Sequence, residues 1–164
     1  MTGRVESIHI IRGIDMPVER LDAVRVHAGR GLEGDRHTPP EGGSHEPGEF
    51  ALTLVEAEAL QAVRDEHGID LSDGRSRRQV MTRGIRLNDL VGREFRVGTI
   101  RCRAVELCEP CTHLQEMTAP GVIKALVHRG GIMADVLEGG TISLGDEVAE
   151  VTAADLRAAR PAPR

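Results

Sequence analysis

Three residues that can carry chemistry lie close together in the segment ELCEPCTHL, residues 106–114. Cys108 and Cys111 are separated by two residues, and His113 follows shortly after them. The third cysteine, Cys102, lies in the alternating run TIRCRAVEL and is expected in the core, because a free cysteine behaves as a small apolar side chain. Cys108 and Cys111 could form part of a metal clip, a redox pair or a site with one working thiolate.

The surrounding residues disfavour the first two alternatives. A structural zinc site requires four ligands, usually two CxxC pairs or one such pair with distant histidines, and the chain has a single CxxC. A redox pair requires the motif at the start of a helix that follows a strand, and Pro110 favours a loop here. A single thiolate that ligates a metal or carries transferable sulfur remains, as does a pair of thiols without chemistry.

Positive charge is concentrated just before the cysteines. Segment 75–103 has nine arginines against Asp89 and Glu94, a formal charge of +7 in a chain whose net charge is −5. Guanidinium groups bind phosphate through paired hydrogen bonds, although arginines also cover solvated strand faces. Arg77 and Arg78 are the strongest candidates, because neighbours on a strand point to opposite faces and one of them must face inward or into a cleft. The nine arginines are residues 75, 77, 78, 83, 86, 93, 96, 101 and 103.

A second candidate segment is GLEGDRH, residues 31–37. Gly31 and Gly34 permit a tight turn, and the Asp35 side chain can cap it. Arg36 and His37 would then project from the turn. Taken alone, the segment is also typical of an ordinary surface turn.

The periodicity predicts a β-rich, mixed α/β fold, a barrel or sandwich with a few peripheral helices. Thr53 and Glu56 form the pattern of a capping box at the start of one helix, and Gly68 has the position of a C-terminal glycine. The segment Thr38–Glu49 has three prolines and three glycines, which indicates a loop that could act as a lid. The expected strands are residues 5–10, 23–29, 99–107 and three within 131–151; the expected helices lie within 51–68, 119–131 and 152–164.

Composition limits the function classes. The 164 residues fit one domain, with 40% hydrophobic and 29% charged residues and only two aromatic side chains, Phe50 and Phe95. Few aromatics and a negative net charge argue against nucleic-acid binding. The N-terminus has no apolar run and the chain has no membrane span, so we expect a cytoplasmic protein in which three reduced cysteines need no disulfide.

The chain resembles the MOSC family, the domain found at the C-terminus of molybdenum cofactor sulfurases and in small stand-alone bacterial proteins. The resemblance extends from about Val5 to Val151, so we expect a single domain over residues 1–151 and a short helix and tail over 152–164. It implies a MOSC-type β-barrel that binds the molybdenum cofactor. It rests on GLEGDRH, on HRGGIMADVLEGGTISLGDEV and on the run SRRQVMTRGIRLNDLVGREFRVGTIRCRAVELCEPCTHLQ.

The resemblance also implies roles for single residues. Cys111 falls on the family's hallmark cysteine, which ligates molybdenum in relatives that reduce N-hydroxylated compounds. Arg77 and Arg78 fall in an RRN-like element expected near the phosphate of the cofactor, and Gln79 stands where asparagine is usual. Cys108 is then a bystander or a resolving thiol. The remaining expected cofactor contacts are Arg36, His37 and Arg83.

Three functions follow from this interpretation. The first is a reductase that removes oxygen from an N-hydroxylated small molecule, with electrons from an external donor, because the chain has no flavin, nicotinamide or iron–sulfur motif. The second is a carrier of persulfide sulfur or cofactor that acts with a separate cysteine desulfurase, since the chain has no pyridoxal phosphate site of its own. The third is an interaction domain without a cofactor. The sequence leaves the oligomeric state open.

Overall fold

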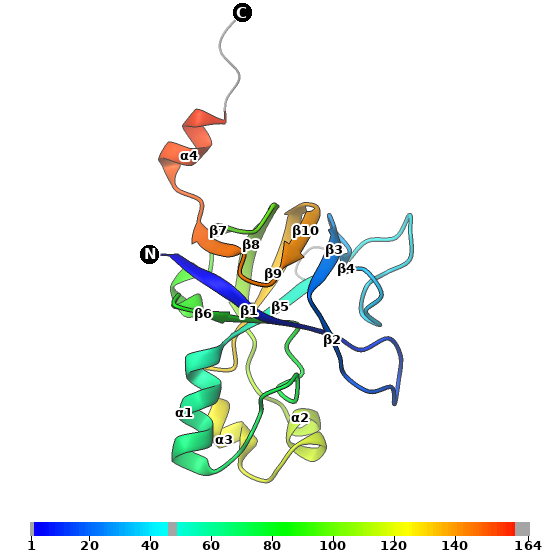
Figure 1. Cartoon of the computed structure of the whole chain (residues 1–164), viewed down its shortest axis with the longest axis vertical. Coiled ribbons are helices and arrows are strands. Elements are labelled where there is room, and N and C mark those ends of the chain that lie inside the picture. Colours follow the sequence, from blue (N-terminus) through cyan, green and yellow to red (C-terminus); the bar gives the residue numbers. More distant parts are fainter. Residues whose placement is uncertain (1, 46–48, 160–164) are drawn as a thin grey trace, which may run out of the picture.

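A closed β-barrel forms the centre of the molecule. The computed structural model describes residues 2–45 and 49–159. Among them, seven strands follow one another around the barrel in the order β11-β7-β8-β9-β5-β6-β1, and β11 pairs with β1 to close it (Figure 1). The seven strands are β1 (Thr2–Ile10), β5 (Leu52–Glu56), β6 (Val80–Arg83), β7 (Glu94–Val97), β8 (Ile100–Leu107), β9 (Ile132–Glu138) and β11 (Glu147–Glu150).

The remaining strands extend this framework. Strand β2 (Glu19–Leu21) pairs with the end of β1, and a separate sheet has the order β10-β3-β4. These three strands are β10 (Gly140–Ser143), β3 (Ala23–His27) and β4 (Gly31–Leu32). All barrel pairings are antiparallel except β5 with β6, which is parallel. The expected β-rich, mixed α/β barrel is therefore confirmed.

The barrel interior is almost entirely aliphatic. Phe95 and Cys102 are fully buried among side chains such as Ile8, Leu52 and Leu54. Alternating residues of β8 face this interior, as the period of the sequence predicted. The placement of Cys102 in the core is confirmed, so this thiol is removed from any chemistry at the surface.

Helices cover one end of the barrel. Helices α1 (Ala57–His67), α2 (Thr112–Met117) and α3 (Val122–Leu126) lie at this end, whereas α4 (Ala153–Ala158) lies at the opposite end (Figure 1). A 3-10 helix, η1 (Leu87–Leu90), follows β6. A second apolar cluster packs the three helices against the barrel; it consists of Val55, Leu60, Val63, Leu71, Leu114, Val122, Ala125 and Leu126. In the described residues, no helix is long and apolar enough to cross a membrane.

The start of the first helix was predicted wrongly. Thr53 and Glu56 belong to β5 and form no capping box, and α1 begins only at Ala57. The reason is tertiary: Leu52 and Leu54 are fully buried in the barrel, and that burial outweighs the local capping pattern. Gly68 does end the helix as expected, with a φ of 68° and its N–H donated to the carbonyl of Arg64.

The expected capped helix near the C-terminus is α4. The Thr152 side chain accepts a hydrogen bond from the backbone N–H of Asp155, and the Asp155 carboxylate accepts one from the backbone N–H of Thr152. Residues 160–164, the end of the expected tail, lie outside the described residues.

Gly131 lies where the chain enters β9 against β5, and it allows a direct test of this packing. Its φ is 100°, and a Cβ there would clash with the carbonyl oxygen of Leu54. We expect Gly131→Ala to lower the free energy of unfolding by roughly 3 kcal/mol, because it adds overpacking to the left-handed backbone cost. Urea denaturation measures the change.

Gly92→Ala is the matched control, since Gly92 has a φ of 82° and no atom within 4 Å of the added Cβ. It carries only the backbone cost, about 1 kcal/mol. Equal losses in the two variants would contradict the close contact between Gly131 and β5.

Candidate functional site

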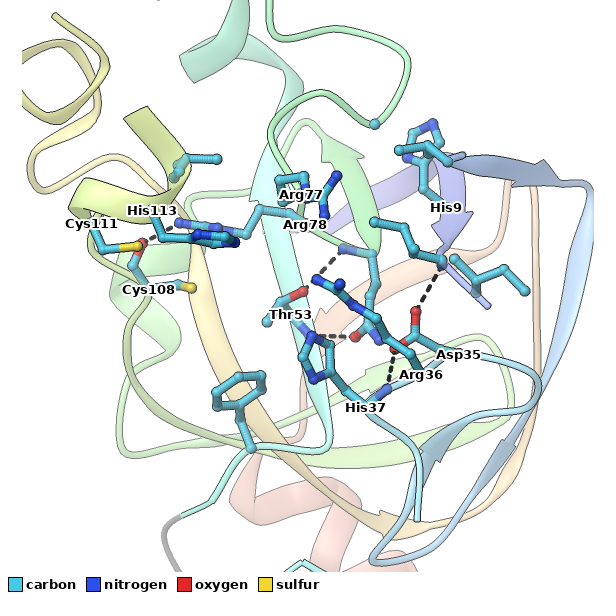
Figure 2. Close-up of a pocket in the computed structure, with 17 residues that line it drawn as sticks. His9, Asp35, Arg36, His37, Thr53, Arg77, Arg78, Cys108, Cys111 and His113 are labelled. Atoms are coloured by element: carbon cyan, nitrogen blue, oxygen red, sulfur yellow. Dashed lines mark hydrogen bonds between the residues drawn. The ribbon is translucent and has the colours of Figure 1, made fainter. Parts of the chain in front are cut away.

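Six segments of the chain meet around one cavity of about 170 Å³. They are the end of β1, the loop before β2, the turn after β4, the strand β5 with the residue Phe50 before it, the loop before β6 and the segment after β8. Figure 2 shows Cys108, Cys111 and His113 at one end of this central cavity and His9, Asp35 and Arg36 at the other. The lining residues are His9, Ile10, Ile11, Val18, Asp35, Arg36, His37, Phe50, Thr53, Gly74, Arg77, Arg78, Gln79, Cys108, Cys111, His113 and Leu114.

The two cysteines of the CxxC motif differ in exposure. Cys111 is exposed and directly precedes α2, whereas Cys108 follows β8 and is buried. Burial raises the pKa of the Cys108 thiol, with the nearby Arg78 guanidinium opposing that rise. Burial also raises the pKa of Cys102 to about 12. Cys111 is therefore the thiol that can act as a nucleophile or a metal ligand at neutral pH.

The CxxC motif lies in a loop, as Pro110 indicated, and this loop is short. The motif follows a strand and ends at a helix, because β8 continues to Leu107 and α2 begins at Thr112. The first thiol is nevertheless the buried one. The motif thus presents one accessible sulfur instead of two.

Arg78 fixes the segment that carries the cysteines. Its side chain is 8% exposed and donates hydrogen bonds to the carbonyl oxygens of Gly130 (2.8 Å), Cys108 (2.9 Å) and Ser76 (3.3 Å). Arg78 lines the cavity as the sequence suggested, but these bonds make it a clamp on the backbone. Its position also differs from the expected one, because residues 77 and 78 form a loop before β6 instead of a strand.

Arg36 and Arg77 are the basic side chains that remain available in the cavity. Within the described part of the chain, neither guanidinium has an ion-pair partner, and the buried Arg36 Nε has no hydrogen-bond partner. Burial, and then the charge of Arg36, lower the pKa of Arg77. Two partly buried cations without a counter-charge form a site that an anion would stabilise.

The other seven arginines of segment 75–103 form ion pairs elsewhere. Arg83 pairs with Glu6 at 2.7 Å and lies near Glu58 at 3.8 Å, so the structure does not bring it together with Cys111. Arg101 and Arg103 both bind Glu94 of the neighbouring strand. The unpaired positive charge of the segment is therefore limited to Arg77 and Arg78, because nearby carboxylates pair with the other seven arginines. The remaining pairs involve arginines 75, 86, 93 and 96.

The turn after β4 aims Arg36 and His37 into the cavity. Asp35 accepts hydrogen bonds from the backbone N–H groups of Ile11 and His37, each at 3.0 Å, so its predicted capping role is confirmed. Burial, and then the charge of Arg36, lower the pKa of His37. His37 is therefore neutral at pH 7. In this form one ring nitrogen can accept a proton and the other can donate one.

Gln79 has a structural role on the cavity wall. Its side-chain oxygen accepts a hydrogen bond from the backbone N–H of Thr53, and its own N–H donates to the Thr53 hydroxyl, both at 3.0 Å. The pair joins the loop before β6 to β5. The residue that departs from the family pattern thus contributes to the geometry of the site.

Sequence reasoning missed His9. The imidazole is 6% exposed and its buried Nε2 has no hydrogen-bond partner. Burial and the charge of Arg20 lower its pKa, and Asp73 opposes them. Four successive residues from Ser7 to Ile10 are buried, so the period of β1 gave no signal that one of them faces a cavity.

The predicted lid segment Thr38–Glu49 is only partly described, since residues 46–48 lie outside the described residues. Thr38 is held by its hydroxyl, which donates to the carbonyl of Leu32 at 2.6 Å. Phe50, just after the segment, lines the cavity. A lid motion stays a prediction.

Comparisons with known proteins agree with this fold. The family model of the MOSC domain matches residues 23–149. No curated protein matches the sequence significantly. The structures of the YUAD protein from Bacillus subtilis, of YiiM from Geobacillus stearothermophilus and of YiiM from Escherichia coli superpose with TM-scores of 0.76, 0.69 and 0.66.

Each of these three structures is 18% identical to the chain, which supports the fold alone. The superpositions cover 90%, 92% and 91% of this chain and 94%, 75% and 70% of the respective relatives.

The exposure of the three cysteines predicts a simple labelling pattern. In the folded protein at pH 7, iodoacetamide should modify Cys111 first, because burial protects Cys102 and Cys108 and raises their pKa. Mass spectrometry after proteolysis identifies the modified residue. Cys111→Ser should leave no rapidly labelled thiol, and rapid labelling of Cys108 in that variant would contradict the assignment.

Proposed function

Because the chain belongs to the MOSC domain family, we propose that it binds the molybdenum cofactor in the central cavity and reduces N-hydroxylated compounds. The observation that carries this proposal is the combination found in one cavity: an exposed thiol, Cys111, and two guanidiniums, Arg36 and Arg77, without counter-charges.

The donor set fits the cofactor. Molybdenum takes soft thiolate ligands, and Cys111 can offer one to a metal that also carries a dithiolene. Arg36 and Arg77 can bind the phosphate through charge-assisted hydrogen bonds, which would satisfy the buried Nε of Arg36. The residues that line the cavity can thus supply both groups that the cofactor requires, a thiolate ligand for the metal and a binding site for the phosphate.

The available volume supports the same assignment. A neighbouring cavity of about 530 Å³ shares Val18 and Arg77 with the central one, so Arg77 lies at the junction of the two. The added space accommodates a ligand larger than the 170 Å³ of the central cavity. This position of Arg77 supports the proposal that it contacts the anionic part of such a ligand.

The reaction consumes two electrons and two protons for each substrate. The N–O bond breaks, the nitrogen keeps its substituent as the amine or amidine, and the oxygen leaves as water. When bound, the cofactor supplies the two-electron, oxygen-atom-transfer chemistry. The electrons come from an external donor, a reduced redox protein or a chemical reductant, because the sequence has no flavin, nicotinamide or iron–sulfur motif.

The residues of the chain orient the reactants and handle protons. Arg78 holds the backbone at Cys108 and so limits the positions that Cys111 can adopt. His37, neutral at pH 7 because burial lowers its pKa, can pass a proton through its ring nitrogens into the cavity. His113 lies beside the cysteines and offers a second imidazole there.

A second candidate function is sulfur transfer. The same exposure of Cys111 would let it carry a persulfide received from a separate cysteine desulfurase. In that case Cys111 carries the sulfur, and turnover of an N-hydroxylated compound is absent.

The test is turnover with a defined donor. Protein made in a host that synthesises the cofactor is supplied with reduced methyl viologen and an N-hydroxylated base, and the reduced product is quantified. We expect wild-type turnover and at least a roughly hundredfold loss in Cys111→Ser, since even outer contacts to a metal site are worth ten- to hundredfold. Cys108→Ser is the matched control and should stay within a few-fold of wild type.

Two results would contradict the proposal. Cofactor-loaded wild type without turnover, together with a persulfide on Cys111, would identify the carrier. Equal losses in Cys111→Ser and Cys108→Ser would remove the special role of Cys111.

A further inference from the structure

The loop between the two cysteines of the CxxC motif has a second attachment besides Arg78. Glu109 directly follows Cys108, and its carboxylate accepts a hydrogen bond from the backbone N–H of His128, with N–O distances of 2.9 and 3.3 Å. The imidazole Nδ1 of His128 lies 3.4 Å from the same carboxylate. Glu109 thus joins the cysteine loop to the turn that follows α3.

The backbone of His128 is itself held from two sides. Its φ is 61°, a left-handed conformation that is uncommon for residues other than glycine. Its carbonyl oxygen accepts a hydrogen bond from the side-chain amide of Asn88 in η1, at 2.8 Å. Such a conformation persists where surrounding contacts hold it, and Glu109 and Asn88 supply two of these contacts. The N–H that Glu109 binds therefore has a fixed position.

Pro110 transmits the position of Glu109 to Cys111. The proline ring fixes its own φ and confines the residue before it to extended backbone, so few rotations remain between the two residues. Cys111 is extended as well, with a φ of −128° and a ψ of 170°. Its carbonyl accepts the N–H of Gln115 in the first turn of α2, at 3.1 Å. Cys111 thus lies between two attachment points, Glu109 before it and α2 after it.

The attachments by Arg78 and Glu109 act at different points of the loop. Arg78 binds the Cys108 carbonyl and fixes where the loop starts, whereas Glu109 fixes the direction in which the loop continues. Cys111 is exposed, so packing around its own side chain contributes little to its position. The sulfur therefore depends on backbone attachments for a defined place in the cavity.

Stability does not account for the contact between Glu109 and His128. Their side chains are 42% and 77% exposed, and exposed ion pairs contribute little to the stability of a fold. Residues that orient a metal ligand, in contrast, are commonly worth ten- to hundredfold in metal affinity. The location of Glu109, two residues before the exposed thiol, fits the second role.

We propose that Glu109 is a positioning residue that fixes Cys111 for metal ligation through its hydrogen bond to the N–H of His128. The inference rests on the function proposed above, because that function makes Cys111 the metal ligand. The hydrogen bond carries the effect, and the negative charge of the carboxylate is not required. Glu109→Gln therefore keeps Cys111 in place, because the amide oxygen accepts the same bond, and Glu109→Ala releases it.

The test measures the mobility of position 111 in protein without cofactor. A methanethiosulfonate nitroxide labels Cys111, since the other two cysteines are buried. Mass spectrometry verifies one label per chain, and electron paramagnetic resonance gives the rotational correlation time. We expect the label to move at least twofold faster in Glu109→Ala than in wild type. Glu109→Gln should give the wild-type spectrum, and this rescue separates the hydrogen bond from the charge.

Three further variants define the contact. Glu116→Ala removes an exposed carboxylate of α2 and should match wild type. His128→Asn keeps the backbone N–H, and asparagine tolerates a positive φ, so this variant should also match. Asn88→Ala should raise the mobility of the label, and it tests the same network if Glu109→Ala unfolds. An unchanged spectrum in folded Glu109→Ala, or equal mobility in Glu109→Ala and Glu109→Gln, would overturn the inference.

A second readout is the release of molybdenum from protein made in a cofactor-competent host. After dilution, Glu109→Ala should lose the metal roughly tenfold faster than wild type and Glu109→Gln at the wild-type rate. Wild-type release from Glu109→Ala, with normal turnover, would overturn the positioning role alone. Wild type without molybdenum, together with a mobile label in Glu109→Ala, would overturn the proposed function and support Glu109 as the residue that fixes Cys111.

Discussion

The guanidinium of Arg78 joins three parts of the chain that are far apart in sequence. Its hydrogen bonds to the carbonyl oxygens of Ser76, Cys108 and Gly130 connect the loop before β6, the end of β8 and the entry to β9. Buried backbone carbonyls need such partners, because an unpaired polar group in the interior is costly. The position of Cys111, three residues after the clamped carbonyl, depends on this one side chain.

Charge pairing on the barrel explains why the cavity differs from the rest of the surface. Glu94 of β7 and Glu138 of β9 neutralise Arg101 of the strand between them, so the outer surface of these strands carries little excess charge. Isolated surface pairs of this kind contribute little to stability, about 0–1 kcal/mol each. Their consequence here is electrostatic contrast: positive charge without a partner is left at Arg36 and Arg77, where an anion can bind.

Much of the fold could be predicted because it follows from local patterns. The alternation of β8, the three strands of residues 131–151 and the glycine that ends α1 are properties of period and turn chemistry. The start of α1 could not be predicted, since burial of β5 in the barrel decided it. The position of Arg83 outside the cavity could not be predicted for a similar reason, because its partner, Glu6, is 77 residues away in sequence.

Site residues were harder to predict than strands. Cys111, Arg77, Arg36 and His37 do meet at one cavity, and they came from a family resemblance and from a turn motif. Sequence reasoning gave no role to His9, because it lies in a run of four buried residues of β1 and the pattern does not show which of them faces the cavity.

The most direct test is the amount of cofactor retained per chain. Molybdenum by elemental analysis and pterin by fluorescence after oxidation should both be near-stoichiometric in wild type from a cofactor-competent host. Cys111→Ser and Arg77→Gln should lose most of both, whereas Arg83→Gln, whose side chain pairs with Glu6 outside the cavity, should retain wild-type amounts. Wild type without molybdenum, or an equal loss in Arg83→Gln, would contradict the assignment of the cavity.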